Sequence, residues 1–153
     1  EIIKPFELVG ITSLYGENTY HFSVASISQS NVFVFDKFSL HKIIDSNTEL
    51  GKSIIELYCK KTKHFFTKII SLGNKQLHGR FADALLYLSN CITGKNLIDI
   101  AITRKEIGEL AGISTESAIR LLSELNHDGI INLEGKSIEI IKIQLLQRLS
   151  EIG

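Results

Sequence analysis

The chain lacks the features that mark several large classes of protein. Its 153 residues contain no Met, no Trp, one Pro and two Cys. No apolar run approaches the length that spans a bilayer, and the first residues do not resemble a signal peptide. Hydrophobic residues make up 44% of the chain and charged residues 22%, a balance that excludes a disordered chain. The sequence therefore predicts a globular protein without a membrane partner, built as one ordinary domain or two small ones.

The residue patterns of catalysis and of metal binding are also missing. Cys59 and Cys91 lie on predicted helices without the spacing of metal ligands, so we expect two reduced and mostly buried thiols. The sequence contains no nucleophile elbow, phosphate-binding loop or paired ligand motif. We therefore expect no enzyme activity, no metal and no cofactor.

An excess of positive charge is missing as well. Seventeen Lys and Arg residues balance seventeen Asp and Glu residues. From Lys75 onward nine basic residues stand against ten acidic ones, a net charge of −1. Because nucleic-acid-binding proteins often carry a basic bias, composition argues mildly against a DNA partner. A case for DNA must come from the local arrangement of residues.

The first 35 residues carry the signals of β-strands. Residues 20–24 alternate apolar and polar side chains, and residues 32–35 are apolar on both faces, which predicts a buried strand. The chain begins at Glu1 without a Met and opens in what looks like the middle of a β-rich unit, so we expect further sequence before it. Asp36 is predicted to cap a short helix to about Ile44, with its apolar side chains facing the core; these are Phe38 and Ile43.

A long helix is predicted over residues 46–72. Ser46 with Glu49 three residues later has the pattern of a capping box at its start. Its apolar residues follow a three–four spacing that suits either a partner helix or the body of the protein, and a two-chain coiled coil is favoured. These residues are Leu50, Ile54, Leu57, Phe65, Ile69 and Leu72.

The sequence after the long helix predicts a hinge, a helix and a short strand. Gly73 and Asn74 both end helices readily. An amphipathic helix follows from Lys75, and residues 97–100 form the predicted strand. The apolar face of this helix consists of Leu77, Phe81, Leu85 and Leu88.

Residues 102–125 have the pattern of a helix-turn-helix. Thr103 and Glu106 form a capping box, and the small residue Gly108 permits a close crossing of the two helices. Gly112 supplies the positive φ that the corner needs, and Ser114 caps the second helix. The buried stripe of that helix is predicted to be Ala118, Leu121, Leu122 and Leu125.

A β-hairpin over residues 130–141, with a Gly-containing turn at residues 134–137, completes a winged helix. The second helix can lie in a major groove, where Arg120 can bind guanine and Glu116 can accept from cytosine. An ordinary exposed ion pair between these two side chains is the alternative. The candidate base-reading residues are Thr115, Glu116, Ile119 and Arg120, and the candidate phosphate contacts are Thr103, Arg104, Ser114, Ser117, Gly135 and Lys136.

These segments resemble the Crp/Fnr family of bacterial transcription regulators. The likeness lies in residues 102–108 and 112–116, in the wing at 133–137, and extends backward through His78–Arg80 and the long helix to Gly10. It implies an α+β fold in which residues 1–73 are the second half of a cyclic-nucleotide-binding-like β-roll with a dimerisation helix at 46–72. Residues 74–153 would be the winged helix-turn-helix domain. It also implies a cytoplasmic homodimer that binds double-stranded DNA, and RNA polymerase if it is an activator.

The sensor half departs from the cyclic-AMP-binding members of that family. The turn at residues 10–12, which begins with Gly10, lacks their carboxylate, and Tyr20 and His21 stand where they hold the phosphate with an Arg–Ser pair. Phe65 and Phe66 occupy the base-binding positions and offer no hydrogen bonds. We therefore expect no response to cyclic AMP. The aromatic residues line either an apolar ligand pocket or an ordinary core.

Two functions remain open at the level of the sequence. A sequence-specific DNA-binding transcription regulator explains the turn, the second helix and the wing together. A winged-helix protein that binds or scaffolds other proteins is the alternative, and the absence of a basic bias is its best support.

Overall fold

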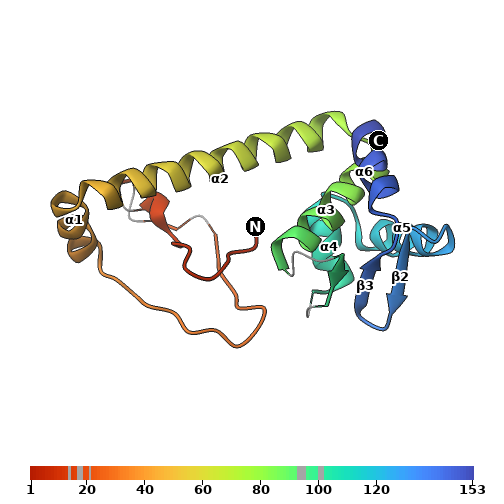
Figure 1. Cartoon of the computed structure of the whole chain (residues 1–153), viewed down its shortest axis with the longest axis horizontal. Coiled ribbons are helices and arrows are strands. Elements are labelled where there is room, and N and C mark those ends of the chain that lie inside the picture. Colours follow the sequence, from red (N-terminus) through yellow and green to blue (C-terminus); the bar gives the residue numbers. More distant parts are fainter. Residues whose placement is uncertain (14, 17–18, 21, 93–95, 100–101) are drawn as a thin grey trace. The chain divides into compact units, whose positions relative to one another are not determined.

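The computed structural model describes residues 1–13, 15–16, 19–20, 22–92, 96–99 and 102–153 (Figure 1). The chain forms two compact units. One contains Pro5–Lys68, and the other contains Glu1–Lys4 together with Ile69–Gly153. Helix α2, Thr48–Asn74, contributes residues to both units.

The Pro5–Lys68 unit contains a 3₁₀ turn at Ile11–Ser13, helix α1 at Lys37–Ser46 and the first part of α2. Asp36 caps α1 as predicted, because its carboxylate accepts the Ser39 N–H at 2.9 Å. Hydrogen bonds from Ser39 lower the pKa of Asp36, so the cap stays ionised. Helix α1 continues two residues beyond the predicted end at Ile44.

The predicted capping box at the start of the long helix is wrong by one residue. Ser46 is the last residue of α1, and its hydroxyl donates to the Ile43 carbonyl at 3.0 Å. Asn47 takes the capping role instead, since its side-chain oxygen accepts the Leu50 N–H at 3.0 Å. Ser46 lies within α1, so Asn47, which directly precedes Thr48, is the residue placed to cap α2.

The strands predicted at residues 20–24 and 32–35 are not formed among the described residues. Residues 22–36 form no helix or strand and belong to no sheet. Val32, Phe33 and Val34 are between 81% and 90% exposed, contrary to the predicted buried strand. A strand needs backbone partners on a neighbouring strand, and apolar alternation alone does not supply them.

Three further burial predictions fail in this unit. Phe38 and Ile43 were expected to face the core, yet both are exposed because α1 buries none of its residues. Lys42 lies over the Phe38 ring, 4.4 Å from its centroid. Cys59 was expected to be buried, but it lies on an exposed face of α2, whereas Cys91 is half-buried; both are free thiols.

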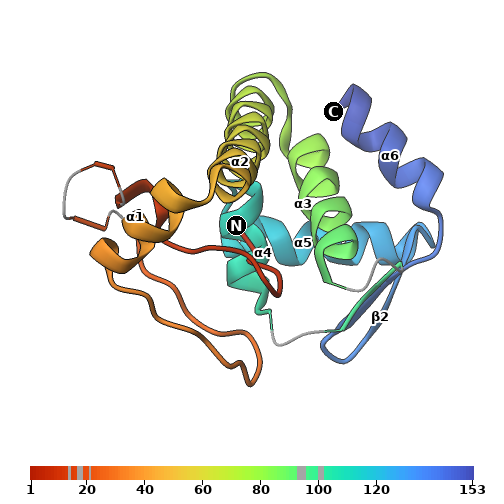
Figure 2. The same cartoon turned by 60° about the vertical axis from the view of Figure 1, so that its left-hand side comes forward.

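The second unit is a helical domain with a small sheet (Figures 1 and 2). Its strands lie in the order β1–β3–β2, with antiparallel pairing throughout. The predicted strand at 97–100 is observed at Leu97–Ile98, and Ile100 lies outside the described residues. The elements are α3 Leu77–Ile92, β1 Leu97–Ile98, α4 Arg104–Ala111, α5 Thr115–His127, β2 Ile131–Glu134, β3 Ser137–Ile140 and α6 Ile143–Ile152.

The core of this unit joins all of its helices to the sheet. The predicted apolar face of α3 is buried except for Leu77, which is partly buried against the same core. The predicted stripe of α5 is buried completely. Helix α6, which the sequence analysis missed, inserts Leu146 into this core, and Ile143 and Leu149 pack beside it. The fully buried large side chains are Phe81, Leu85, Leu88, Ile107, Leu121, Ile131, Ile138 and Leu146.

A polar cluster ties the end of α2 to α3 and α6. The Asp83 carboxylate accepts hydrogen bonds from Ser71 at 2.6 Å, from Lys75 at 2.9 Å and from Ser150. Lys75 also approaches the Ser150 hydroxyl at 3.3 Å. Burial works to raise the pKa of Asp83, but these hydrogen bonds together lower it. The charge of a partly buried carboxylate is thereby stabilised where the long helix ends.

Candidate nucleic-acid interface

The corner between α4 and α5 has the predicted construction. Thr103 and Glu106 form a complete capping box at the start of α4. Gly112 ends α4 in the left-handed region with φ 66°, and Arg80 donates to its carbonyl at 3.3 Å. A Cβ on Gly108 would lie 3.1 Å from the Ile113 carbonyl oxygen. Glycine at this position therefore permits the close crossing of the two helices.

The first turn of α5 presents a defined set of polar groups. The Ser114 hydroxyl accepts the Ser117 N–H at 3.2 Å, and the two serine hydroxyls lie 3.2 Å apart. Hydrogen bonds from its own backbone N–H and from Ser114 lower the pKa of Glu116. Glu116 is thus an ionised acceptor at the positive end of the helix.

The candidate base-reading residues lie on one side of α5. Glu116, Ile119 and Arg120 are exposed and Thr115 is half-buried. The alternative expectation of an ion pair between Glu116 and Arg120 is wrong, because Arg120 pairs with Glu124 at 3.1 Å. Glu124 was missed by the sequence analysis, and it lies four residues after Arg120 just as Glu116 lies four residues before it.

The wing is fastened to both helices of the corner. Gly135 forms the hairpin turn with φ 60°, and Lys136 beside it is exposed. Arg104 at the start of α4 donates to the Gly135 carbonyl at 3.3 Å. Asn126 near the end of α5 accepts the Leu133 N–H at 3.0 Å. Arg104 therefore braces the wing turn, in addition to its predicted place beside a phosphate.

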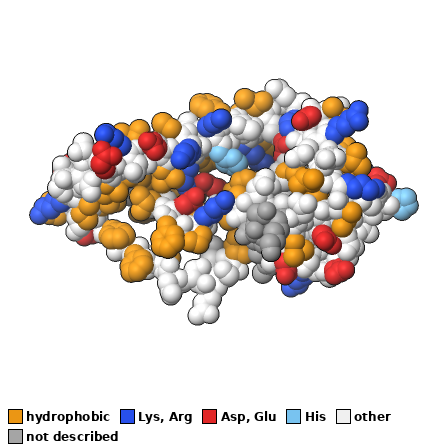
Figure 3. All heavy atoms as spheres, viewed as in Figure 1, with side chains coloured by type: hydrophobic (Ala, Val, Ile, Leu, Met, Phe, Trp, Pro, Cys, Tyr) orange, Lys and Arg blue, Asp and Glu red, His pale blue; other side chains and the backbone are white. Residues whose placement is uncertain are grey.

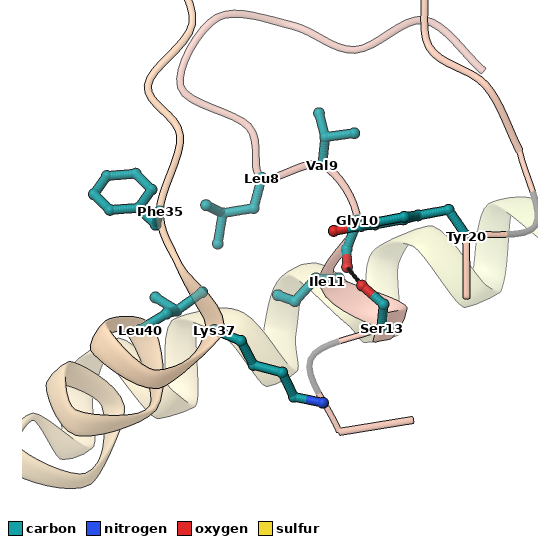
Figure 4. A pocket seen from close by; sticks show the side chains of 9 residues that line it. All are labelled: Leu8, Val9, Gly10, Ile11, Ser13, Tyr20, Phe35, Lys37 and Leu40. Carbon is teal, nitrogen blue, oxygen red and sulfur yellow. Dashed lines mark hydrogen bonds between the residues drawn. The ribbon is translucent and has the colours of Figure 1, made fainter. Parts of the chain in front are cut away.

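The predicted effector residues come together only in part. A cavity of about 260 Å³ in the Pro5–Lys68 unit contains Gly10 and Tyr20 (Figure 4). Phe65 and Phe66 are exposed on α2 and do not line it, and His21 lies outside the described residues. The lining consists of Leu8, Val9, Gly10, Ile11, Ser13, Tyr20, Phe35, Lys37 and Leu40.

The predicted seam of the long helix divides into two parts. Ile54 is buried within the chain, and Leu50 and Leu57 are half-buried. The remaining three, Phe65, Ile69 and Leu72, are 56%, 64% and 41% exposed. Figure 3, drawn in the same view as Figure 1, shows hydrophobic side chains at the surface along α2.

Among the described residues, no helix has the length and apolar character that a membrane span requires.

Two helices joined by a tight corner and followed by a hairpin define the Glu1–Lys4 and Ile69–Gly153 unit as a winged helix-turn-helix. Residues 79–149 match the model of the Crp-like helix-turn-helix domain. This match confirms the resemblance to the Crp/Fnr family that the sequence shows.

Solved structures of the same fold include the following two proteins. One is FixK2 from Bradyrhizobium japonicum, with 24% identity, a TM-score of 0.70, and coverage of 74% of this chain and 58% of that one. The other is TTHA1359, a transcriptional regulator of the CRP/FNR family from Thermus thermophilus, with 24% identity, a TM-score of 0.61, and coverage of 69% and 56%. The present chain thus spans less than three-fifths of the length of FixK2 and of TTHA1359. A comparison with curated proteins found no match.

Proposed function

We propose that the protein is a sequence-specific DNA-binding transcription regulator of the Crp/Fnr type that acts as a homodimer. The observation that carries this proposal is the exposed face of α5, held against α4 and the wing by defined contacts in a Crp-like domain. An exposed helix face held in this way can enter a major groove while the wing turn approaches the backbone. Because the chain has no net positive charge, the case for DNA binding depends on this local geometry.

The proposed contacts divide into two groups by chemistry. Arg120 offers paired N–H donors to guanine, and ionised Glu116 accepts from the cytosine amino group, while Thr115 and Ile119 contact neighbouring base edges. Groups at the start of α4, at the start of α5 and at the wing turn bind phosphate oxygens. This second group consists of Thr103, Arg104, Ser114, Ser117, Gly135 and Lys136.

The homodimer is supported by an apolar row on α2. The exposed residues Ile55, Tyr58, Phe65, Ile69 and Leu72 follow heptad spacing if Thr62 fills the gap. This row shares its last three members with the predicted seam and replaces Leu50, Ile54 and Leu57 with Ile55 and Tyr58. Two parallel copies of α2 joined along this row would present two copies of α5 to half-sites about one DNA turn apart.

The sensor half is proposed either to bind a ligand other than cyclic AMP or to bind no ligand, in which case DNA binding is constitutive. The cavity beside Gly10 is lined mainly by apolar side chains, with Lys37 as its cation. Among the residues that the structure describes, its lining contains neither the paired Arg–Ser donors for a cyclic phosphate nor a carboxylate for the ribose. We further propose that residues 1–73 form the sensor half and residues 74–153 the DNA-binding half. The protein is proposed to be cytoplasmic, and to bind RNA polymerase if it activates transcription.

Selection of bound sequences from a random pool of double-stranded DNA, without added ligand, tests the proposal. Enrichment of a two-fold symmetric site is the expected outcome, and binding to it must weaken steeply with salt. No enrichment, either alone or with cell extract, from a folded dimer would contradict the proposal. It would favour a winged-helix protein that binds other proteins, the function to which the missing basic bias points.

A further inference from the structure

We propose that Glu124 is a specificity-determining positioning residue, which holds the Arg120 guanidinium for base reading and is itself held by His78. The inference rests on the proposed function. It assigns a role to two side chains, on α3 and α5, that lie outside the predicted set of DNA contacts.

Both oxygens of the Glu124 carboxylate are engaged, and they are engaged from two helices. Arg120 on α5 donates from Nη1 to Oε1 at 3.1 Å. His78, the second residue of α3, places Nε2 3.3 Å from Oε2. The side chains of Arg120, Glu124 and His78 are 56%, 42% and 50% exposed, so the group remains accessible to a ligand. The carboxylate therefore connects α3 to α5, the helix that is proposed to read DNA.

The contact leaves the reading function of Arg120 intact. A guanidinium has five N–H donors, and guanine needs two of them for O6 and N7. With one Nη1 donor directed at Glu124, the remaining donors on Nη2 and Nε can face a base. A free Arg side chain loses rotamer entropy when it binds, and a partner that already orders it reduces this loss.

The negative charge of Glu124 should affect DNA affinity and base preference in opposite directions. A carboxylate near DNA repels phosphates, so Glu124 lowers affinity for every sequence while it raises the preference for the correct base. A merely structural ion pair would change both affinities together through stability. Lys105 and Glu109 on α4 form an exposed pair of the same i,i+4 type, at 3.7 Å, and supply a matched control.

The experiment uses duplexes that carry the site selected by the wild-type protein. Each guanine in turn is replaced by 7-deazaguanine, which removes the N7 acceptor and keeps the base pair. The guanine whose replacement no longer weakens binding of Arg120→Ala is the base that Arg120 reads. At that guanine, Glu124→Ala should reduce the penalty for 7-deazaguanine by about threefold to tenfold. The same variant should bind unrelated DNA more tightly than the wild type does.

Three comparisons complete the design. Glu124→Gln keeps an acceptor for Arg120 and should restore part of the penalty. His78→Ala should change it in the same direction as Glu124→Ala, but less, because one of the two contacts to the carboxylate remains. Glu109→Ala should leave the penalty unchanged. Thermal unfolding of every variant separates readout from stability.

The outcomes are distinct. An unchanged penalty in Glu124→Ala overturns the positioning role, even if its DNA affinity changes. If no guanine responds to Arg120→Ala, the inference also fails, while selective DNA binding by other residues stands. If the wild-type protein selects no sequence, the proposed function and the inference fall together.

Discussion

At the scale of the residue, Gly112 fixes the corner between α4 and α5. Its φ of 66° lies in the left-handed region, and a Cβ there would approach a Leu72 methyl carbon to 2.5 Å. Gly112→Ala should therefore lower the free energy of unfolding by about 2 kcal/mol, from backbone strain and displacement of Leu72. Chemical denaturation followed by circular dichroism measures the change.

Gly73 provides the matched control for this prediction. It lies inside α2, where a Cβ would meet nothing within 4 Å. Gly73→Ala should raise the free energy of unfolding by about 0.5 kcal/mol, because alanine restricts the unfolded chain without strain in the helix. Equal effects of the two substitutions would show that the conformation at Gly112 carries no special cost.

Substitution of Lys136 can distinguish phosphate binding from base reading. It is exposed at the wing turn beside Gly135. Lys136→Ala should weaken binding to all sequences about equally and reduce the slope of log affinity against log salt by about 1. Affinities measured across a salt series test this. Lys142→Ala is the control, because the Lys142 ammonium donates to the Asp128 carbonyl at 3.2 Å. An equal loss of salt slope in Lys142→Ala would show that Lys136 makes no particular contact with phosphate.

Local residue patterns predicted the corner well and the partner of Arg120 badly. A capping box, a glycine corner and a serine cap are each decided within four residues, so Thr103, Gly112 and Ser114 were identified correctly. Glu116 and Glu124 both lie four residues from Arg120, and spacing cannot choose between them. The helix start already engages Glu116, whereas His78 from α3 meets Glu124, and that tertiary contact is invisible in the sequence.

At the scale of the element, the cluster around Asp83 fastens three helices. The pKa of Asp83 is lowered from the usual value of 3.8, so its charged form stabilises the fold above that pH. This contribution is lost as the pH falls through 3.8 toward the lower folded-state value. Asp83→Asn should cost about 2 kcal/mol near neutral pH, through weaker hydrogen bonds to Ser71, Lys75 and Ser150.

The pH dependence distinguishes the charge from simple packing. In urea denaturation from about pH 7 down to about pH 3, the difference between the wild type and Asp83→Asn should shrink at the acid end. Ser150→Ala keeps the carboxylate and should cost less. A difference that is constant across this range would contradict an ionised Asp83 as the source of the stability.

Elements were predictable where their partners were near in sequence. The helices at 77–92 and 104–127 and the hairpin at 131–140 each show their own period. Residues 20–24 and 32–35 also show a strand pattern, but a strand requires a partner that their own pattern does not supply. Helix α6 was missed, although Ile143, Leu146 and Leu149 recur at helical spacing.

At the scale of the whole molecule, the proposed dimer depends on which face of α2 is left uncovered. The sequence showed an apolar helix but could not divide its residues between the chain itself and a partner. Ile54 is buried within the chain, whereas Ile55, Tyr58 and Phe65 are between 49% and 64% exposed. A shift by one residue at the start of the row therefore changes the predicted interface without changing the predicted helix.

Phe65→Glu tests that interface. A carboxylate at this position would be desolvated against the second copy of α2, so the dimer dissociation constant should rise by at least about 100-fold, or about 3 kcal/mol. Thr67→Glu adds the same charge two residues away, at an exposed position outside the row, and should leave the constant nearly unchanged. Sedimentation equilibrium measures both variants. Binding to a two-fold symmetric site should weaken with Phe65→Glu while binding to a single half-site does not. A stable dimer of Phe65→Glu would place the interface on another surface.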